Sequence, residues 1–178
     1  MPYRGRMRWE ALFADLEAQL EAARATEAAA DVAELTRAER ATVDLGSRLR
    51  AAHGHALTLR SGTARVAGTV LDAAEQWVLL GDGAARWLVP TSGVTAVRGL
   101  PVHAAPAPGV VERRLSLGHA LRAVARDRST VRVVLDDEEL VGRVDRVGAD
   151  HLDLTVPVPH PGTVWAVPFR AVRAVRTA

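Results

Sequence analysis

The sequence repeats itself, and this internal repeat constrains the fold more than any other feature. The phrase WLVPTSGVTAVR begins at Trp87, and the related phrase WAVPFRAVRAVR begins 78 residues later at Trp165. Segments further upstream repeat at offsets of 72 and 74 residues, so that Gly68 aligns with Gly142. Ordered agreement over roughly 50 residues at a nearly constant offset is the signature of a duplicated structural unit. We therefore expect two copies of one small fold.

Each copy predicts a short helix followed by five short strands. The helical segments are LGSRLRAA (residues 45–52) and LGHALRAV (residues 117–124). After them, apolar and polar residues alternate, as at Leu57 and Leu59 in the first copy, which is the periodicity of a strand with one buried face. Turn residues separate the later strands, and a longer loop in the second copy accounts for the growing offset.

Both copies contain a glycine and a proline at equivalent positions. Gly68 and Gly142 fall inside the second strand, where a glycine marks a bend or a close approach of backbones. Pro90 and Pro168 end the fourth strand, because proline cannot donate a hydrogen bond to a strand ladder. A bent sheet of five short strands curls most simply into a small barrel, and two such barrels packed together bury more surface than one alone.

The predicted fold class is therefore mainly β with α. We expect a long N-terminal helix in residues 1–44, a first barrel in 45–98, a proline- and glycine-rich linker in 99–114, and a second barrel in 115–178.

The N-terminal segment has the composition of a long helix. From Arg6 to Leu45 it contains no proline or glycine, and strong helix formers dominate. One helix of about 40 residues is the preferred interpretation, and two helices with a break near residues 26–31 are the alternative. An apolar stripe lies at the spacing of one helix face; its members are Trp9, Phe13, Leu16 and Leu20. This stripe predicts either a coiled-coil dimer or a helix that folds back on its own barrels.

Composition and charge exclude several classes of protein. The 178 residues include no cysteine, which excludes disulfides, thiolate metal sites and a cysteine nucleophile. We expect no membrane span and no signal peptide, and hence a cytoplasmic protein. All 23 basic residues are arginine, which reflects either codon usage in a GC-rich genome or phosphate recognition. Residues 1–45 hold nine acidic residues and six arginines, and the remainder holds 12 and 17, so the C-terminal part is the basic one.

No constellation of residues predicts catalysis. His53 and His55 have no third ligand at a metal-site spacing, and Gly54 between them is expected as the C′ residue that ends the short helix. The acidic run at residues 136–139 is expected to be a solvated hairpin turn. No nucleophile-elbow motif is present. We expect no enzyme activity, no cofactor and no metal.

Taken together, the helix, five short strands, bend glycine and proline turn resemble the Sm-like (LSm, Hfq-type) barrel, a member of the SH3-like barrels. The resemblance covers residues 45–98 and 117–176, although the family's second motif, an Arg-Gly or Lys-His pair, is absent. In Sm-like proteins RNA is held by the loops after the second and fourth strands. In the second copy those loops lie near residues 146–151 and 169–171.

The resemblance thus implies a nucleic-acid site on the second copy. Its loops and last strand supply the candidate residues Arg146, His151, Phe169, Arg170, Arg173 and Arg176. Arginine and histidine could cradle a phosphate, and an aromatic ring could stack on a base. The alternative is that Phe169 is a core side chain and the basic residues are solvated surface.

The whole chain also resembles a group of actinobacterial proteins that carry the label Fis family transcriptional regulator. A Fis-type protein needs a C-terminal helix-turn-helix, whereas AVPFRAVRAVRTA predicts a strand, a turn and a strand. The sequence therefore favours a non-enzymatic regulatory protein that binds nucleic acid, RNA more than DNA. A protein-interaction scaffold with an oligomerising helix is the alternative, and Arg122, Arg126 and Arg128 leave sequence-specific DNA binding open. A homo-oligomer is expected in either case.

Overall fold

The computed structural model describes residues 4–109, 114–157 and 162–177; the side chains of residues 4–12, 39 and 40 are outside this description. The chain divides into two units, Met1–Val43 and Asp44–Ala178. This division falls at the predicted end of the N-terminal helix. In the described part of the chain, no helix has both the length and the apolar character that crossing a membrane requires.

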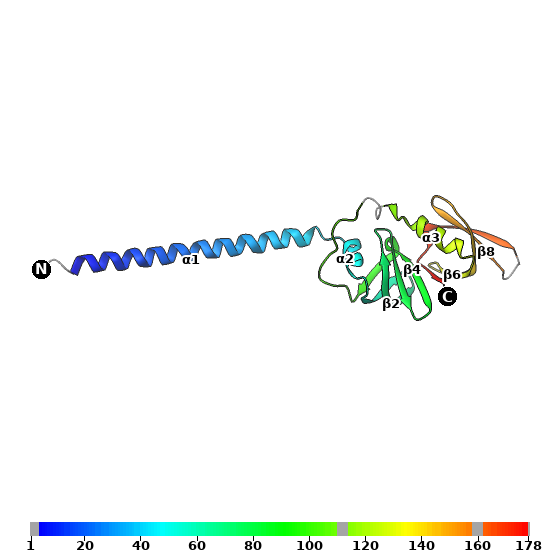
Figure 1. The fold of residues 1–178 in the computed structure, drawn as a ribbon, viewed down its shortest axis with the longest axis horizontal. Helices are drawn as coiled ribbons and strands as arrows, with labels where there is room; N and C mark the ends of the chain where they lie inside the picture. Colours follow the sequence, from blue (N-terminus) through cyan, green and yellow to red (C-terminus); the bar gives the residue numbers. More distant parts are fainter. Residues whose placement is uncertain (1–3, 110–113, 158–161, 178) are drawn as a thin grey trace. The chain divides into compact units, whose positions relative to one another are not determined.

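The first unit is one continuous helix, α1 (Arg4–Ala41), drawn in blue in Figure 1. The preferred interpretation of one helix rather than two is confirmed. The predicted apolar stripe is exposed: Phe13, Leu16 and Leu20 have exposed fractions of 59%, 51% and 52%. The side chain of Trp9, the fourth predicted member, lies outside the described residues. What covers this stripe stays a prediction.

The second unit contains the predicted helix and five strands twice. The first set is α2 (Leu45–Ala51), β1 (Ala56–Ser61), β2 (Ala64–Ala73), β3 (Trp77–Asp82), β4 (Ala85–Pro90) and β5 (Val94–Arg98). The second set is α3 (Leu117–Arg126), β6 (Thr130–Val134), β7 (Glu139–Val147), β8 (His151–Val156), β9 (Thr163–Pro168) and β10 (Ala174–Thr177). A short 3-10 turn separates the last two strands of each set: η1 (Thr91–Gly93) and η3 (Phe169–Ala171). The prolines end the fourth strands as predicted.

The strands form a single ten-stranded antiparallel sheet in the order β5-β1-β2-β3-β4-β10-β6-β7-β8-β9. Within each half, the fifth strand lies beside the first and the others follow in sequence order. The halves are joined where β4 pairs with β10, with Leu88 opposite Val175 and Trp87 opposite Arg176. We call this β4–β10 pair the seam. Mainly β architecture with an N-terminal helix is thus confirmed.

The two bend glycines allow a close approach of neighbouring backbones. A Cβ atom added at Gly68 would lie 2.5 Å from the carbonyl oxygen of Gly81, and one at Gly142 would collide with the carbonyl oxygen of Thr155. In both halves the strand register then shifts a few residues later, between Val70 and Asp72 in β2 and at the matching place in β7. A glycine followed by a bulge bends a strand, so the predicted role of these residues is confirmed.

Two apolar clusters form the core, and each draws residues from both halves. The first-half cluster is built around Leu49, Leu59 and Leu80 and also includes Val134 and Ala174 from the second half. The second-half cluster is built around α3 and β6–β8 and also includes Ala74, Trp77 and Leu88 from the first half. The two halves therefore share their core across the seam.

Side-chain caps fix the start of each short helix. The Asp44 carboxylate accepts a hydrogen bond from the Ser47 amide at 2.7 Å, and the Ser116 hydroxyl accepts one from the His119 amide at 3.2 Å. At the end of α2 the C-cap is Ala52, and Gly54 adopts a φ of +78°. The glycine thus turns the chain one residue later than predicted.

The described part of the linker, residues 99–109, lies along α2. The Arg48 guanidinium donates two hydrogen bonds to the carbonyl of Pro101, at 2.8 and 3.1 Å, and the Ala105 amide donates to the carbonyl of Ser47. Residues 110–113 of the predicted linker lie outside the described residues. The contacts with α2 show that the first part of the linker is held in place.

Candidate nucleic-acid interface

The two loops of the second half to which the Sm-like resemblance assigned a nucleic-acid site lie next to each other. The amide of Phe169 in η3 donates a hydrogen bond to the carbonyl of Asp150, at 2.7 Å, in the turn between β7 and β8. Next in the chain, His151 begins β8. This bond brings His151, Phe169 and Arg170 into one neighbourhood, although they lie on two separate loops.

One carboxylate is hydrogen-bonded to the ring of His151, and a second carboxylate lies near it. Its Nδ1 lies 2.9 Å from Oδ1 of Asp150, and its Nε2 lies 3.9 Å from Oδ1 of Asp153. The hydrogen bond with His151 lowers the pKa of the Asp150 carboxyl, and the charge of Arg170 contributes in the same direction. A ring between two carboxylates is poorly placed to bind a phosphate directly, so we assign His151 to the positioning of the loop.

Arg146 lies on β7, opposite Asp153 on β8, and its side chain is exposed. Because side chains opposite each other share a face of the sheet, Arg146 lies on the same face as Asp153 and His151. Among the described residues, Arg146 makes no ion pair within 4.0 Å. Its guanidinium is available to an anion.

The ring of Phe169 contacts the core on one side and lines a surface hollow on the other. Its ring packs against the second-half core and comes within van der Waals distance of Gly118 at the start of α3, where an added Cβ would lie 3.4 Å from the ring. The ring is nevertheless only half-buried. Its remaining surface lines a hollow of about 340 Å³ next to the seam. The core and ligand interpretations of this residue are therefore compatible.

That hollow, which we call the seam hollow, is built from both halves. Its lining residues are Gln76, Thr91, Ser92, Leu117, Phe169 and Arg170. None of them carries a carboxylate. The Gln76 side-chain oxygen accepts a hydrogen bond from the Leu117 amide, and the Thr91 hydroxyl donates to the carbonyl of Glu75. Within the described part of the chain, the Gln76 amide nitrogen, the Ser92 hydroxyl and the Arg170 guanidinium make no hydrogen bond, and all three residues line the hollow.

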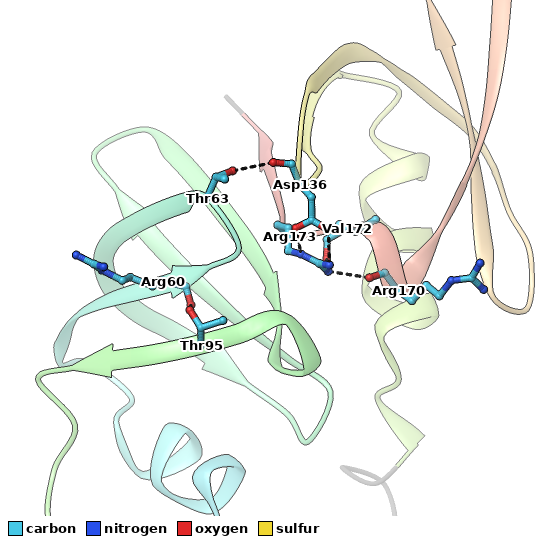
Figure 2. A network of polar contacts seen from close by, with 7 residues as sticks. All are labelled: Arg60, Thr63, Thr95, Asp136, Arg170, Val172 and Arg173. Carbon is cyan, nitrogen blue, oxygen red and sulfur yellow. Dashed lines mark hydrogen bonds and ion pairs between the residues drawn. The ribbon is translucent and has the colours of Figure 1, made fainter.

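Arg173 is engaged in a structural ion pair. Its Nε and Nη2 atoms each lie 2.7 Å from a carboxylate oxygen of Asp136, and its Nη1 donates to the carbonyl of Arg170, also at 2.7 Å. Figure 2 shows this network, together with the hydrogen bond from the Thr63 hydroxyl to the carbonyl of Asp136. In the same view the Arg170 guanidinium points away from the network. Arg173 therefore holds two turns together, while Arg170 remains open to a ligand.

Arg176 is also engaged, at the seam. Its guanidinium lies 5.6 Å from the centre of the Trp87 ring, a cation–π contact between β10 and β4. Of the six predicted nucleic-acid residues, His151, Phe169 and Arg170 share one neighbourhood and Arg146 shares a face with His151. Arg173 and Arg176 make contacts elsewhere.

A second basic surface was missed by the sequence prediction. Arg60, Arg65 and Arg98 line a hollow of about 200 Å³ on the first half, again with no carboxylate in the lining. In the second half, the position of Arg65 is taken by Glu139, which pairs with Arg132 at 2.6 Å. A position-by-position comparison of the two copies could have revealed that the charge at this position changes from positive to negative.

Among residues 4–109, 114–157 and 162–177, no group of three or more His, Asp or Glu side chains could hold a metal ion. Known proteins add no identification: neither the protein-family models nor the curated proteins that we searched match this chain. Its own residues therefore carry the functional interpretation.

Proposed function

We propose that this chain is a cytoplasmic, non-enzymatic regulatory protein that binds single-stranded nucleic acid, RNA in preference to DNA, on tandem Sm-like barrels. The barrel organisation is supported by the strand order: in each half the fifth strand lies beside the first, after a short helix. The glycine and bulge at matching places in β2 and β7 provide the bend that a barrel needs.

The seam hollow is the single observation that carries the proposed function. It combines an aromatic surface from Phe169, a guanidinium from Arg170 and hydrogen-bonding groups from Gln76 and Ser92. Proteins that bind single-stranded nucleic acid use this combination: a ring for the base, a cation for the phosphate and polar groups for the base edge or the 2′-hydroxyl. Because no carboxylate lines the hollow, nothing in its wall repels a phosphate.

Single-stranded RNA is favoured over duplex DNA by the state of the two short helices. A recognition helix must present one face to the major groove. In α3, Leu117 and Leu121 are buried in the core, and Arg122 donates a hydrogen bond to the carbonyl of Gly148. The buried face of the helix thus packs in the core, and one of its two arginines is bonded to the neighbouring loop.

The test is a binding titration with fluorescently labelled single-stranded RNA and DNA of the same sequence. The double variant Arg146→Ala/Arg170→Ala should weaken RNA binding by about tenfold or more, since it removes two phosphate contacts. The affinity of the unaltered chain should fall steeply with salt. The matched control, Arg132→Ala/Arg143→Ala, removes two arginines that already pair with Glu139 and Asp145, and should have little effect. Salt-insensitive binding, no binding at low salt, or equal losses in both double variants would overturn the proposal.

A protein-interaction scaffold is the second candidate, and the exposed stripe on α1 favours it. Phe13, Leu16 and Leu20 lie on one face of a 38-residue helix and are all more than half exposed. A helix with an uncovered apolar stripe commonly docks on another helix or in a groove. Protein partners that remain bound after nuclease and high salt, and that are lost in Phe13→Asp/Leu20→Asp, would favour this function.

A further inference from the structure

Three arginine side chains gather on the outer face of the first half. Arg60, Arg65 and Arg98 line the hollow of about 200 Å³ described above, which we call the arginine hollow. Its other lining residues are Thr58, Ala96 and Val97. Among the described residues its wall therefore contains no carboxylate and no aromatic ring. All three arginines are exposed, and in the described part of the chain none of them takes part in an ion pair.

The strand register brings these three side chains together. Arg60 on β1 lies directly opposite Arg65 on β2, and on its other side it lies opposite Ala96 on β5. Arg98 follows two residues after Ala96, so it shares the face of Arg60 and is its diagonal neighbour. Like charges directly opposite each other destabilise a sheet. A bound anion would remove this repulsion between Arg60 and Arg65.

Hydrogen bonds anchor the backbone that carries the arginines. The Thr95 hydroxyl on β5 donates to the carbonyl of Arg60 at 3.2 Å, and the Thr63 hydroxyl in the β1–β2 turn donates to the carbonyl of Asp136, also at 3.2 Å. Figure 2 shows both bonds, and it shows the Arg60 guanidinium pointing away from the Asp136–Arg173 network. A ligand would thus meet side chains on a backbone that is already ordered, which lowers the entropy cost of binding.

The acidic turn at residues 136–139 lies near Arg65 without neutralising it. The turn and Arg65 both line a larger hollow of about 540 Å³. Two of the four carboxylates in the turn already pair with other arginines. Because no ion pair joins Arg65 to the turn within the described residues, its charge remains available to the arginine hollow.

The second half shows that the fold does not require these arginines. By the offsets of the repeat, the positions of Arg60, Arg65 and Arg98 are taken by Val134, Glu139 and Arg176. The first of these is buried, the second pairs with an arginine, and the third lies over the ring of Trp87. Both copies form the same strands, so the three unpaired cations are a property of the first copy alone. This difference indicates a role other than folding.

We propose that the arginine hollow binds a compact polyanion, namely a group of two or three linked phosphates. A planar guanidinium donates two parallel hydrogen bonds to phosphate oxygens, and three guanidiniums around one hollow suit an anion whose charges are concentrated in one place. Pockets for drug-sized ligands measure about 300–1,000 Å³, so this smaller hollow accommodates the phosphate groups alone.

The phosphates themselves are the recognised chemistry, because the wall offers no ring on which a base could stack. Free diphosphate or triphosphate and the phosphate end of a nucleotide both supply this chemistry. The site lies on the first half and uses none of the residues of the seam hollow. The inference is therefore independent of the proposed binding of RNA.

Isothermal titration calorimetry with inorganic triphosphate tests the site. The full chain is titrated without divalent cations, at an ionic strength of about 0.15 M, where long-range attraction between exposed charges is screened. We expect one triphosphate per chain, and an affinity that falls from triphosphate to diphosphate to orthophosphate. The variant Arg60→Gln/Arg98→Gln should bind triphosphate about tenfold more weakly or less, because it removes two charged hydrogen-bond donors.

The matched control is Arg132→Gln/Arg143→Gln, which removes two arginines of the second half that already pair with carboxylates. It should bind triphosphate like the unaltered chain. A further variant, Arg65→Glu, introduces the residue type that the second half has at this position. It should lose triphosphate binding, and its unfolding temperature without triphosphate should rise, because opposite charges replace like charges across the strands. A lower unfolding temperature would show that the loss comes from damage to the fold.

A nucleoside triphosphate distinguishes the two sources of the anion. Affinity equal to that of inorganic triphosphate would support recognition of the phosphates alone, and tighter binding that still needs Arg60 and Arg98 would assign the site to a nucleotide.

Three results would overturn the inference. They are equal losses in the two double variants, no binding of triphosphate by the unaltered chain at millimolar concentrations, and displacement of triphosphate by single-stranded RNA that has no terminal phosphate. The last result would make the hollow part of a nucleic-acid surface. Arg146→Ala/Arg170→Ala should bind triphosphate normally even where it loses RNA, so the two proposals can fail separately.

Discussion

At the scale of single residues, Arg173 is a charged side chain that has a structural role, because it links two turns. Its sequence neighbourhood, between a loop and a basic strand, suggested phosphate binding. The structure pairs it with Asp136, 37 residues earlier in the chain, and with the carbonyl of Arg170. Nothing local predicts this pairing, because the acidic turn and the arginine meet only when β10 lies beside β6.

The Asp136–Arg173 pair predicts a dependence of stability on pH. The hydrogen bond from Arg173 lowers the pKa of Asp136 below its ordinary value of 3.8. A carboxyl whose pKa is lower in the folded state stabilises the protein above its unfolded-state pKa, and this contribution is lost as the pH falls through the folded-state pKa. The unfolding temperature of Asp136→Asn should therefore be lower than that of the unaltered chain at neutral pH, and the difference should shrink below pH 3.8.

The measurement is thermal unfolding at a series of pH values from neutral to acidic. Asp137→Asn is the matched control, since Asp137 belongs to the same turn and makes no ion pair among the described residues. Because Asp136 is exposed, the effect should be small. A difference between Asp136→Asn and the unaltered chain that stays constant with pH would show that the charge of the pair does not contribute.

At the scale of elements, the helices and strands could be predicted from the sequence, and their pairing could not. The repeat, the alternation of Leu57 and Leu59, and the turn residues mark each element within its own local stretch of chain. No local sequence pattern predicts the pairing of β4 with β10, because that pairing depends on which edge of each copy meets the other. The candidate site shows the same division: the loops that hold Phe169 and Arg170 were predicted, but the first-half wall of Gln76 and Ser92 was not.

The helix α1 is predicted to be dispensable for the fold of the remaining chain. It forms a unit of its own, and among the side chains that the structure describes the buried core residues lie in Asp44–Ala178. A chain that begins at Asp44, and so keeps the N-cap of α2, should unfold at nearly the same temperature as the full chain. Its far-UV circular dichroism should lose much of the helical signal. A large fall in the unfolding temperature would show that the stripe of Phe13, Leu16 and Leu20 is covered by the sheet-containing unit.

At the scale of the whole molecule, the seam joins the two sequence repeats into one compact unit. Leu88 belongs to β4 but packs in the second-half cluster, and Val134 belongs to β6 but packs in the first-half cluster. Removing the buried side chain of either residue should therefore destabilise both halves. This coupling would not exist between two barrels joined only by a linker.

The substitution Leu88→Ala tests the coupling. Its side chain is 4% exposed, so the cavity should lower the free energy of unfolding by about 2–5 kcal/mol. Hydrogen exchange monitored at β1 and β2, and separately at β7 and β8, should accelerate to the same extent in both halves. Leu71→Ala, at a residue that is 36% exposed, is the control and should have a small effect. Faster exchange confined to one half would indicate that the repeats unfold independently.

The seam also has a consequence for how the two repeats respond to dilution. Because both repeats belong to one polypeptide, the β4–β10 joint forms within a molecule and does not depend on protein concentration. On dilution the two repeats therefore stay together, because neither can diffuse away from the other.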